Sequence, residues 1–595
     1  MKDDRVDAGL AGPSLAHNEE PGPSLVHLGD SELPICCVMK RQRDGEDAEA
    51  GKNSHLQDAQ TRNGAKETFI TERDVGIECY AHDVQRFHGI LKLRYSDFGV
   101  VEIDSKGDVV QLKGEAVPED VQVEMGDTAE VQACLGQEMA DALREIVSNR
   151  KGKITTKVIG SKEERTHIHQ SLRRLHPHLD SVTLPDDCID ITYTKRPSRR
   201  QGGQYLHLSM YKENKDTMEV VSLLARLLKI STKQIGFAGT KDRRGVTCQR
   251  ISVRGLAQQR ALGLNKSLRG VRLGNPTYAD NELKLGDLMG NEFSITVREV
   301  DESFETVDGA IRSLRDHGFV NYFGMQRFGT SEVPTHTVGK LVLANKYREA
   351  VDALLLPCGG QLPESDAARQ GWQESRDVTL TLQKMPRKCV AEVTVLTSLQ
   401  TAKEDYSRAF AAIPRNLKLI YIHAYQSYVW NKAASARMTL GLTPIEGDLV
   451  ASAIEEGVAR ARPISAIEVD RYNIYDILLP TPGHDILYPQ SLKQVYMDVM
   501  AEDGLDPEQM TRAEREMSLT GSYRNLLFRP QHVSYTTFEY TERDELLNAT
   551  PLQQLKPKEN LHADGTSSFK GVRVQMRLGT AQYATMAMRE IMECK

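Results

Sequence analysis

The stretch GFAGTKDRRGVTCQR at residues 236–250 places one carboxylate, Asp242, in a basic turn between glycines. Directly after the turn, VTCQRISVR (246–254) alternates as a half-buried strand does. Before it, DTMEVVSLLARLLKI (216–230) repeats apolar residues at helical spacing, with Asp216 as the expected N-cap. The sequence therefore predicts a helix, a glycine-containing loop that carries Asp242, and a strand.

Two interpretations of this loop stay open from the residues alone. Lys-Asp-Arg-Arg beside glycines is common in solvated turns. Alternatively, Asp242 is a functional carboxylate that neighbouring cations such as Lys241 keep ionised, and the glycines let a ligand approach the backbone. A carboxylate among phosphate-binding cations could act on a sugar carbon of a polyanion, which is related to the chemistry of glycoside hydrolysis.

The composition excludes several classes of protein. The chain has 595 residues and a net charge of −7, so overall charge does not indicate nucleic-acid binding, although 173–178 and 194–201 are basic clusters. Its nine cysteines include no C-x-x-C pair, which argues against a zinc ribbon and favours reduced thiols. No apolar run is long enough to span a bilayer, and the first residues lack a signal-peptide layout, so we expect a soluble intracellular protein.

Common cofactor and metal motifs are absent from the sequence. It contains no G-x-x-x-x-G-K-[ST], no G-x-G-x-x-G that opens a helix, and no H-E-x-x-H. The H-x-E…P-C-x-x-C signature of zinc deaminases is also missing. These observations favour an enzyme without a cofactor or metal, or a binding protein.

The composition and the pattern of apolar residues change several times along the chain. Residues 1–74 are rich in Gly, Pro, Asp and Glu and are predicted to form a disordered tail, in which KRQR (40–43) could act as a nuclear signal. A mostly helical region after Thr330 separates two parts with strand-like patterns. This arrangement predicts one discontinuous domain that carries an insertion. Strands are expected at 88–104 around a turn, 205–211, 291–300 and 572–578, and helices at 417–438 and 582–592.

Two further stretches could contact a nucleic acid. NYFGMQRFG (321–329) is strand-like, and its aromatic residues could stack on an extruded base or pack in the core. EERTHIHQSLRRLHP (163–177) is helical in pattern, with Arg165 and His169 on one face. That face suits phosphate contacts, although charged helix faces are usually just solvated.

Together these pieces form one ordered series that resembles the TruD family of pseudouridine synthases. The resemblance covers roughly residues 77–595, and the segments 211–221 and 479–489 are similar to the eukaryotic branch. The series consists of YSDFGVVE (95–102), GFAGTKDRRGVTCQR, LMGNEFSITVRE (288–299), NYFGMQRFG and GTAQYATMAMREI (579–591).

The resemblance implies an α+β fold in three parts. A pseudouridine-synthase domain with a mixed, largely antiparallel sheet would comprise residues 75–330 and 528–595, interrupted by a TRUD domain at 331–527. A smaller nucleic-acid-binding-like insertion, of the type named for an Arg and a His spaced four apart, would occupy about 110–200 and include Arg165 and His169. RNA would lie between the catalytic and TRUD domains.

The resemblance also implies roles for individual residues. Asp242 would be the catalytic aspartate, with Lys92 and Lys241 holding it ionised. Tyr583 stands where bacterial members carry a substrate-contacting phenylalanine, and His207 is expected to approach the RNA. The residues expected at the target base are Phe98, which matches the family aromatic against it, and Asn321 and Phe323 of the N-Y-F-G motif.

The implied activity is the isomerisation of specific uridines in tRNA, of the pseudouridine(13) type, and in mRNA or other RNA, by a monomer of the nucleus or cytoplasm without a cofactor. Asp242 would be either the nucleophile at C1′ or the base at C2′. Two alternatives are an RNA-binding or chaperone protein of the same fold without essential catalysis, and a carboxylate hydrolase of another sugar substrate.

Overall fold

The computed structural model describes residues 70–112, 127–157, 159–176, 178–194, 203–329, 333–359, 363–452, 460–512, 517–548 and 568–594. The tail that we predicted lies outside the described residues as far as residue 69, and so does most of the basic cluster at 194–201. Among the described residues, no helix is long and apolar enough to cross a membrane.

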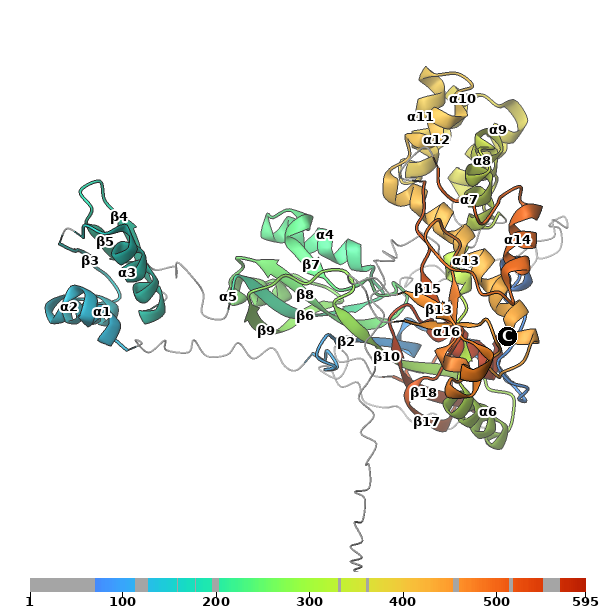
Figure 1. The fold of residues 1–595 in the computed structure, drawn as a ribbon, viewed down its shortest axis with the longest axis horizontal. Coiled ribbons are helices and arrows are strands. Elements are labelled where there is room, and N and C mark those ends of the chain that lie inside the picture. Colours follow the sequence, from blue (N-terminus) through green and yellow to red (C-terminus); the bar gives the residue numbers. More distant parts are fainter. Residues whose placement is uncertain are drawn as a thin grey trace, which may run out of the picture.

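A ten-stranded sheet dominates the fold, in the order β17-β18-β10-β2-β8-β6-β9, with β1, β7 and β19 pairing beside this path (Figure 1). Neighbouring strands are antiparallel except in the β2–β8 and β1–β19 pairs, so the sheet is mixed and largely antiparallel, as expected. Near the end of the chain, β18 pairs with β10, which lies near its middle, and β17 pairs with β18. The bounds are β1 Phe87–Leu91, β2 Phe98–Asp104, β6 Tyr205–Glu213, β7 Ile235–Phe237, β8 Val246–Arg254, β9 Val271–Ala279, β10 Leu288–Arg298, β17 Gln531–Tyr540, β18 Phe569–Gly579 and β19 Met592–Cys594.

Apolar residues alternate along the strands in the half of the sheet that contains residues 236–250. In β6, Leu206, Leu208 and Met210 are buried on one face, because successive side chains of a strand point to opposite faces. Helix α4 (Thr217–Leu228) contributes to the same core. The N-cap of α4 is Asp216, whose side chain accepts hydrogen bonds from the backbone amides of Met218 and Glu219. The predicted helix and its predicted N-cap are therefore confirmed.

The sheet belongs to two hydrophobic cores. One contains β6, β7, β8 and β9 with α4 and α5 (Gln258–Gly263). The other contains residues of β1, β2, β10 and β18 with α6 (Phe304–His317) and α16 (Ala584–Ile591) and continues into the helical region. The two halves meet at the short parallel pairing of 99–101 in β2 with 246–248 in β8.

Helices dominate the chain after Thr330, as the sequence predicts, and Figure 1 shows them stacked at one end of the molecule. The longest, α13, runs beside α7 and buries Trp430. The helices are α7 Thr335–Leu343, α8 Tyr347–Leu354, α9 Pro363–Ser375, α10 Val378–Lys384, α11 Val390–Thr401, α12 Tyr406–Ala411, α13 Arg415–Thr439 and α14 Lys493–Glu502. A four-stranded sheet accompanies them, with β12 Leu449–Ala451, β13 Ala461–Pro463, β14 Leu478–Pro480 and β15 Tyr523–Asn525.

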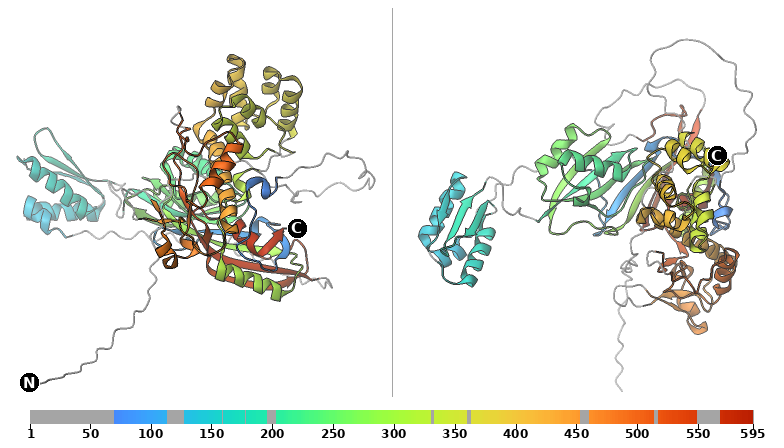
Figure 2. Two further views of the ribbon diagram at one scale, coloured as in Figure 1. Left: turned by 45° about the vertical axis from the view of Figure 1, so that its right-hand side comes forward. Right: turned by 90° about the horizontal axis from the view of Figure 1, so that it is seen from above.

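A small unit within 127–194 has a core of its own, which includes Leu143, Leu172 and Ile191. Figures 1 and 2 show it set apart from the large sheet. It consists of α1 Ala129–Leu135, α2 Gln137–Asn149, β3 Lys153–Thr155, α3 Lys162–Leu175, β4 Leu179–Thr183 and β5 Ile189–Tyr193. The helix that we expected around Arg165 and His169 is present as α3.

Two expectations need correction. The stretch 321–329 is not a strand: β11 ends at Val320 after pairing with β16 (Leu527–Phe528), and a 3₁₀ turn follows at Met325–Arg327. The consecutive residues 321–323 are all buried. The aromatic residues of this stretch are therefore explained by burial on every side, and not by a half-buried strand. The structured part of the chain also begins before residue 74, because Glu72, within the expected tail, accepts a hydrogen bond from Arg589 Nε at 2.7 Å.

Candidate active site

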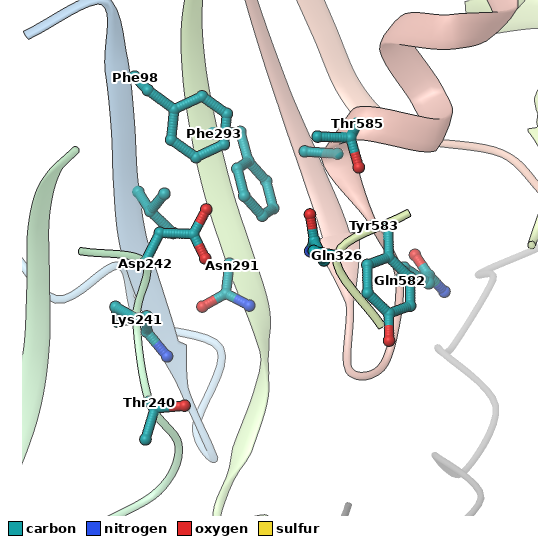
Figure 3. Close-up of a pocket in the computed structure, with 12 residues that line it drawn as sticks. Phe98, Thr240, Lys241, Asp242, Asn291, Phe293, Gln326, Gln582, Tyr583 and Thr585 are labelled. Atoms are coloured by element: carbon teal, nitrogen blue, oxygen red, sulfur yellow. The ribbon is translucent and has the colours of Figure 1, made fainter. Parts of the chain in front are cut away.

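A pocket with about 500 Å³ of open space lies where the two halves of the sheet meet (Figure 3). The lining residues come from five segments that are distant in the sequence. They are Phe98 and Val100 of β2, Thr240, Lys241 and Asp242 of the β7–β8 loop, Asn291 and Phe293 of β10, Gln326 of the 3₁₀ turn, and Gln582, Tyr583, Ala584 and Thr585 at the start of α16.

Asp242 and Lys92 form an ion pair at this pocket. Lys92 Nζ donates a hydrogen bond to Asp242 Oδ2 at 3.0 Å. The same ammonium lies 3.7 Å from the centre of the Phe98 ring, which is a cation–π distance. Lys92 follows β1 with a φ of 54°, a left-handed conformation that is strained for a residue with a side chain. One cation therefore contacts both the carboxylate and an aromatic wall.

The surroundings of Asp242 favour its ionised form. Its side chain is 44% exposed through the pocket, yet the carboxylate lies in a concavity where surrounding protein atoms still reduce its hydration. This burial raises the pKa, but the charge and hydrogen bond of Lys92, followed by the charges of Lys212 and Lys241, outweigh it. The pKa of Asp242 is thus below its ordinary value, and the carboxylate is ionised at neutral pH.

The charge of Lys241 contributes to the low pKa of Asp242 from a distance. Its ammonium does not contact Asp242 but pairs with Glu102 Oε2 at 3.1 Å, and both side chains are almost fully buried. Arg244 is also turned away, since its Nη2 donates to the Leu93 carbonyl at 2.9 Å. Adjacent side chains point in different directions from the backbone, so sequence neighbours of Asp242 are not its nearest cations.

Buried polar residues that the sequence analysis did not single out fasten the Asp242 loop. The Lys241 amide donates to Thr217 Oγ1 at 3.0 Å, and Thr217 Oγ1 donates to Gln249 Oε1 at 3.0 Å. Gln249 Nε2 in turn donates to the Gly239 carbonyl at 2.8 Å. A third such residue, Lys212, donates to the loop from β6.

These supporting residues leave a signal in the sequence. Lys212 continues the face of β6 formed by Leu206, Leu208 and Met210, and it is fully buried. Charged residues are almost never fully buried unless they are paired. A lysine at the next core position of an apolar alternation could therefore have been identified from sequence alone.

Aromatic rings form much of the remaining pocket wall. Phe98 and Phe293 meet edge to face with their centroids 6.0 Å apart, and Tyr583 lies on the opposite side in Figure 3. Gly245 permits the approach of the loop to β2, because a Cβ there would lie 2.8 Å from the Phe98 carbonyl oxygen. The glycine is therefore required for this close packing.

Asn321 and Phe323 lie behind this wall and do not line the pocket. The Asn321 amide oxygen accepts a hydrogen bond from Arg524 Nη2 at 2.7 Å. Phe323 is 5% exposed and packs edge to face on Trp430 and Tyr583, with centroids 5.5 and 6.4 Å apart. Because neither side chain lines the pocket, their expected contact with a base stays a prediction.

His207 does not line the pocket either. It lies in β6, five residues or about 17 Å along the strand from Lys212. Its Nε2 is 2.9 Å from the Asn281 carbonyl oxygen, and burial lowers its pKa. The structure thus separates His207 from the Asp242 site.

Arg165 and His169 contact their own unit. Arg165 pairs with Asp187 at 3.1 Å. The two ring nitrogens of His169 lie 2.7 Å from Ser181 Oγ and 2.9 Å from Thr183 Oγ1. Both residues thus connect α3 to neighbouring segments of the small unit.

One cluster among the described residues has side-chain atoms that could converge on a metal ion. It comprises His88, Asp301 and Glu302. The cluster is not part of the pocket lining, and exposed acidic groups of this kind are common without a metal. We assign no metal site to it.

Chemically, the pocket combines an ionised carboxylate, a cation in contact with it, and aromatic walls. Such a site suits catalysis at the sugar of a nucleotide whose planar base stacks on the rings, since carboxylates can act at an anomeric carbon and flipped bases bind between aromatic side chains.

Comparison with known proteins identifies the class. The family model of tRNA pseudouridine synthase D (TruD) matches residues 187–591. Multisubstrate pseudouridine synthase 7 of Schizosaccharomyces pombe is 34% identical, with 92% of this chain and 93% of that protein covered. The human pseudouridylate synthase 7 homolog is 35% identical, over 88% of this chain and 81% of that protein.

The fold is similar to that of a solved TruD structure as well. The crystal structure from Methanosarcina mazei has a TM-score of 0.56 and 23% sequence identity, and it covers 87% of this chain and 97% of that chain. The chain belongs to the TruD family. It is a pseudouridine synthase, an isomerase, close to the eukaryotic pseudouridine synthase 7 proteins.

Proposed function

We propose that the pocket isomerises uridines within tRNA, of the pseudouridine(13) type, and within other RNAs, with Asp242 as the catalytic carboxylate. The observation that carries this proposal is the 3.0 Å pair of Lys92 and Asp242 in a pocket walled by Phe98. The multisubstrate description of the Schizosaccharomyces pombe relative supports more than one kind of RNA substrate.

The reaction requires three changes at one nucleotide. The N1–C1′ bond breaks, the uracil turns over, and a bond forms between C5 and C1′, after which C5 loses its hydrogen as a proton and N1 takes up a proton. Rotation about the axis through N3 and C6 exchanges N1 with C5, so the free base needs to turn only within the pocket. Isomerisation leaves no net change in oxidation state and transfers no group to another molecule.

Asp242 has two routes open to it in this reaction. As a nucleophile it would attack C1′ and hold the ribose as an ester while the uracil turns. As a base it would remove the C2′ proton and give a glycal. Both routes need the ionised carboxylate, which the ammonium of Lys92 favours.

The aromatic side chains are proposed to hold the base. Extruding a base from its stack costs a few kcal/mol, and stacking on an aromatic ring returns about 1–3 kcal/mol. Phe98 and Tyr583 line the pocket and are suited to this contact. Phe323 and Asn321 would act indirectly, by supporting Tyr583 from behind.

The proposed division of the chain places the catalytic domain in 75–330 and 528–595, with the TRUD domain at 331–527 between its parts. The strands that the two parts contribute to one sheet support this division. The small unit within 127–194 would be an additional RNA-binding module, which the expected Arg165–His169 pattern suggests.

The test is release of tritium from RNA labelled at uridine C5, because formation of pseudouridine must expel that hydrogen. Wild-type protein should release tritium, and Asp242→Asn should release none while still binding RNA. Asp280→Asn, an exposed carboxylate outside the pocket lining, is the matched control and should behave as wild type. Undiminished release by Asp242→Asn would refute the assignment, and absence of release from wild type would favour the RNA-binding alternative.

A further inference from the structure

Lys212 is a buried lysine for which the reaction scheme above gives no task. It is 0% exposed and stands near the end of β6, on the face that Leu206, Leu208 and Met210 line. An ammonium in such a place loses its hydration, and this cost must be offset by hydrogen bonds and opposite charge.

The hydrogen bonds of Lys212 end on backbone carbonyls around the Asp242 loop. Its Nζ donates to the carbonyl oxygens of Lys241 and Asp242, each at 3.1 Å, and to that of Lys215 at 2.8 Å. A lysine ammonium has three donors, and these three acceptors match them. Two of the three belong to the loop itself, so the position of the loop and the protonation of Lys212 depend on each other.

Charged groups from each neighbouring segment surround this ammonium. Asp216 at the start of α4 and Asp242 on the loop favour its charge, and Glu219 in the first turn of α4 does so more weakly. Lys241 on the loop opposes it, although that ammonium is itself paired with Glu102. The positive charge of Lys212 in turn helps to keep Asp242 ionised, after the contribution of Lys92.

We propose that Lys212 is a positioning residue of the isomerase: from beneath the pocket it holds the Asp242 loop by the carbonyls of residues 241 and 242 and places a positive charge behind the carboxylate. This inference rests on the proposed catalytic role of Asp242. It assigns Lys212 to the chemical step, because Lys212 is buried below the loop and does not line the pocket that would receive RNA.

The geometry implies a dependence on pH. Burial lowers the pKa of Lys212 to about 8, with Asp216 and Asp242 partly opposing this shift. The ammonium is therefore present below about pH 8 and is lost as the pH rises through that value. A neutral amine has only two N–H donors, so one carbonyl then loses its partner and the support of the loop weakens.

The experiment compares wild type with Lys212→Met, Lys212→Arg and the exposed control Lys233→Met. Thermal unfolding establishes which variants fold, and steady-state tritium release then gives kcat and KM across the pH range. Lys212→Met should lower kcat about 10²-fold, which is typical when a catalytic group is displaced by about 1 Å, with little change in KM. Its acidic limb should move to higher pH, because Asp242 loses a cation that lowers its pKa.

The pH profile separates this role from a purely structural one. Wild type should lose kcat above about pH 8, whereas Lys212→Arg, whose guanidinium stays charged, should lack that alkaline limb. The inference is overturned if folded Lys212→Met keeps the wild-type kcat, or if Lys212→Arg keeps the same alkaline limb. Should neither variant fold, a wild-type kcat that stays constant to well above pH 8 overturns it.

A parallel measurement on Asp242→Asn distinguishes a failure of the proposed function from a failure of the proposed role of Lys212. Activity in Asp242→Asn would remove the proposed function itself. An inactive Asp242→Asn beside a fully active Lys212→Met would leave that function standing and remove only the role of Lys212.

Discussion

The two sides of the pocket are built in different ways. On one side, Asp242 is held by charged and polar groups, with Lys92 in contact and Lys212, Thr217 and Gln249 behind the loop. The other side carries Tyr583, which packs against Phe323 and lies 5.7 Å from the guanidinium carbon of Arg524. We infer that the charged side serves the chemistry, with Phe98 there also in contact with the base, and that the side of Tyr583 serves the binding of the base.

The difference shows how each kind of support is achieved. A carboxylate that must stay ionised needs cations near it, and the two with the largest effect, Lys92 after β1 and Lys212 in β6, act more strongly than Lys241, the neighbour of Asp242 in the sequence. The ring of Tyr583 packs against Phe323, and the helical region supports Phe323 in turn through Trp430. The sheet and the helical region therefore contribute separately to one site.

Removal of Lys92 should have the largest effect after loss of Asp242 itself. Lys92→Met removes the cation that contacts both Asp242 and Phe98. Loss of one such electrostatic contact typically lowers kcat about 10²-fold or more. Activity needs the ionised carboxylate and is lost as the pH falls through the pKa of Asp242. Without Lys92 the pKa of Asp242 is higher, so the acidic limb of the pH profile should move to higher pH.

The control for Lys92→Met is Lys106→Met, at an exposed position in the turn after β2. It should keep the wild-type pH profile. The interpretation of the charged side fails if Lys92→Met raises only KM and leaves both kcat and the acidic limb unchanged.

Substitution of Tyr583 should affect binding more than chemistry. Tyr583→Ala removes a ring that lines the pocket and should weaken binding of the target RNA by about 1–3 kcal/mol. Tyr583→Phe keeps the ring and should remain close to wild type. The measurement is KM and RNA affinity for both variants, and a Tyr583→Phe variant as impaired as Tyr583→Ala would show that stacking is not the main contribution.

Changes in the small unit should have the smallest effect on isomerisation. His169→Ala removes contacts to Ser181 and Thr183, each worth about 1 kcal/mol, so hydrogen exchange within 127–194 should become faster. RNA affinity and kcat should change less than about threefold if the residue is mainly structural. A large loss of affinity and a smaller salt dependence in Arg165→Ala would instead indicate a phosphate contact.

Much of this architecture is predictable from short-range patterns. The capped helix before the Asp242 loop, the alternating strand after it and the mostly helical region follow from residue spacing and are present. The contact of Lys92 with Asp242 joins residues that are 150 positions apart. It could be expected only from resemblance to a family, since no local pattern encodes it.

The sequence does not indicate side-chain directions that depend on distant partners. Lys241 turns to Glu102 because that buried carboxylate needs a cation, and no feature of the loop indicates this. Asn321 accepts a hydrogen bond from Arg524, and Phe323 packs against Trp430. Both partners belong to a different part of the chain. Lys212, in contrast, carries a local signal, as a charged residue on an otherwise apolar strand face.

The most direct test of the central claim is a single-turnover measurement at saturating RNA, combined with the RNA dissociation constant of the same preparations, for Asp242→Asn and Tyr583→Ala. The account predicts that Asp242→Asn binds RNA as wild type does but shows no isomerisation. It predicts that Tyr583→Ala binds more weakly yet reacts at nearly the wild-type rate once saturated. Isomerisation by Asp242→Asn, or a Tyr583→Ala variant with normal affinity and a lost chemical step, would contradict the division of the pocket into a catalytic and a binding side.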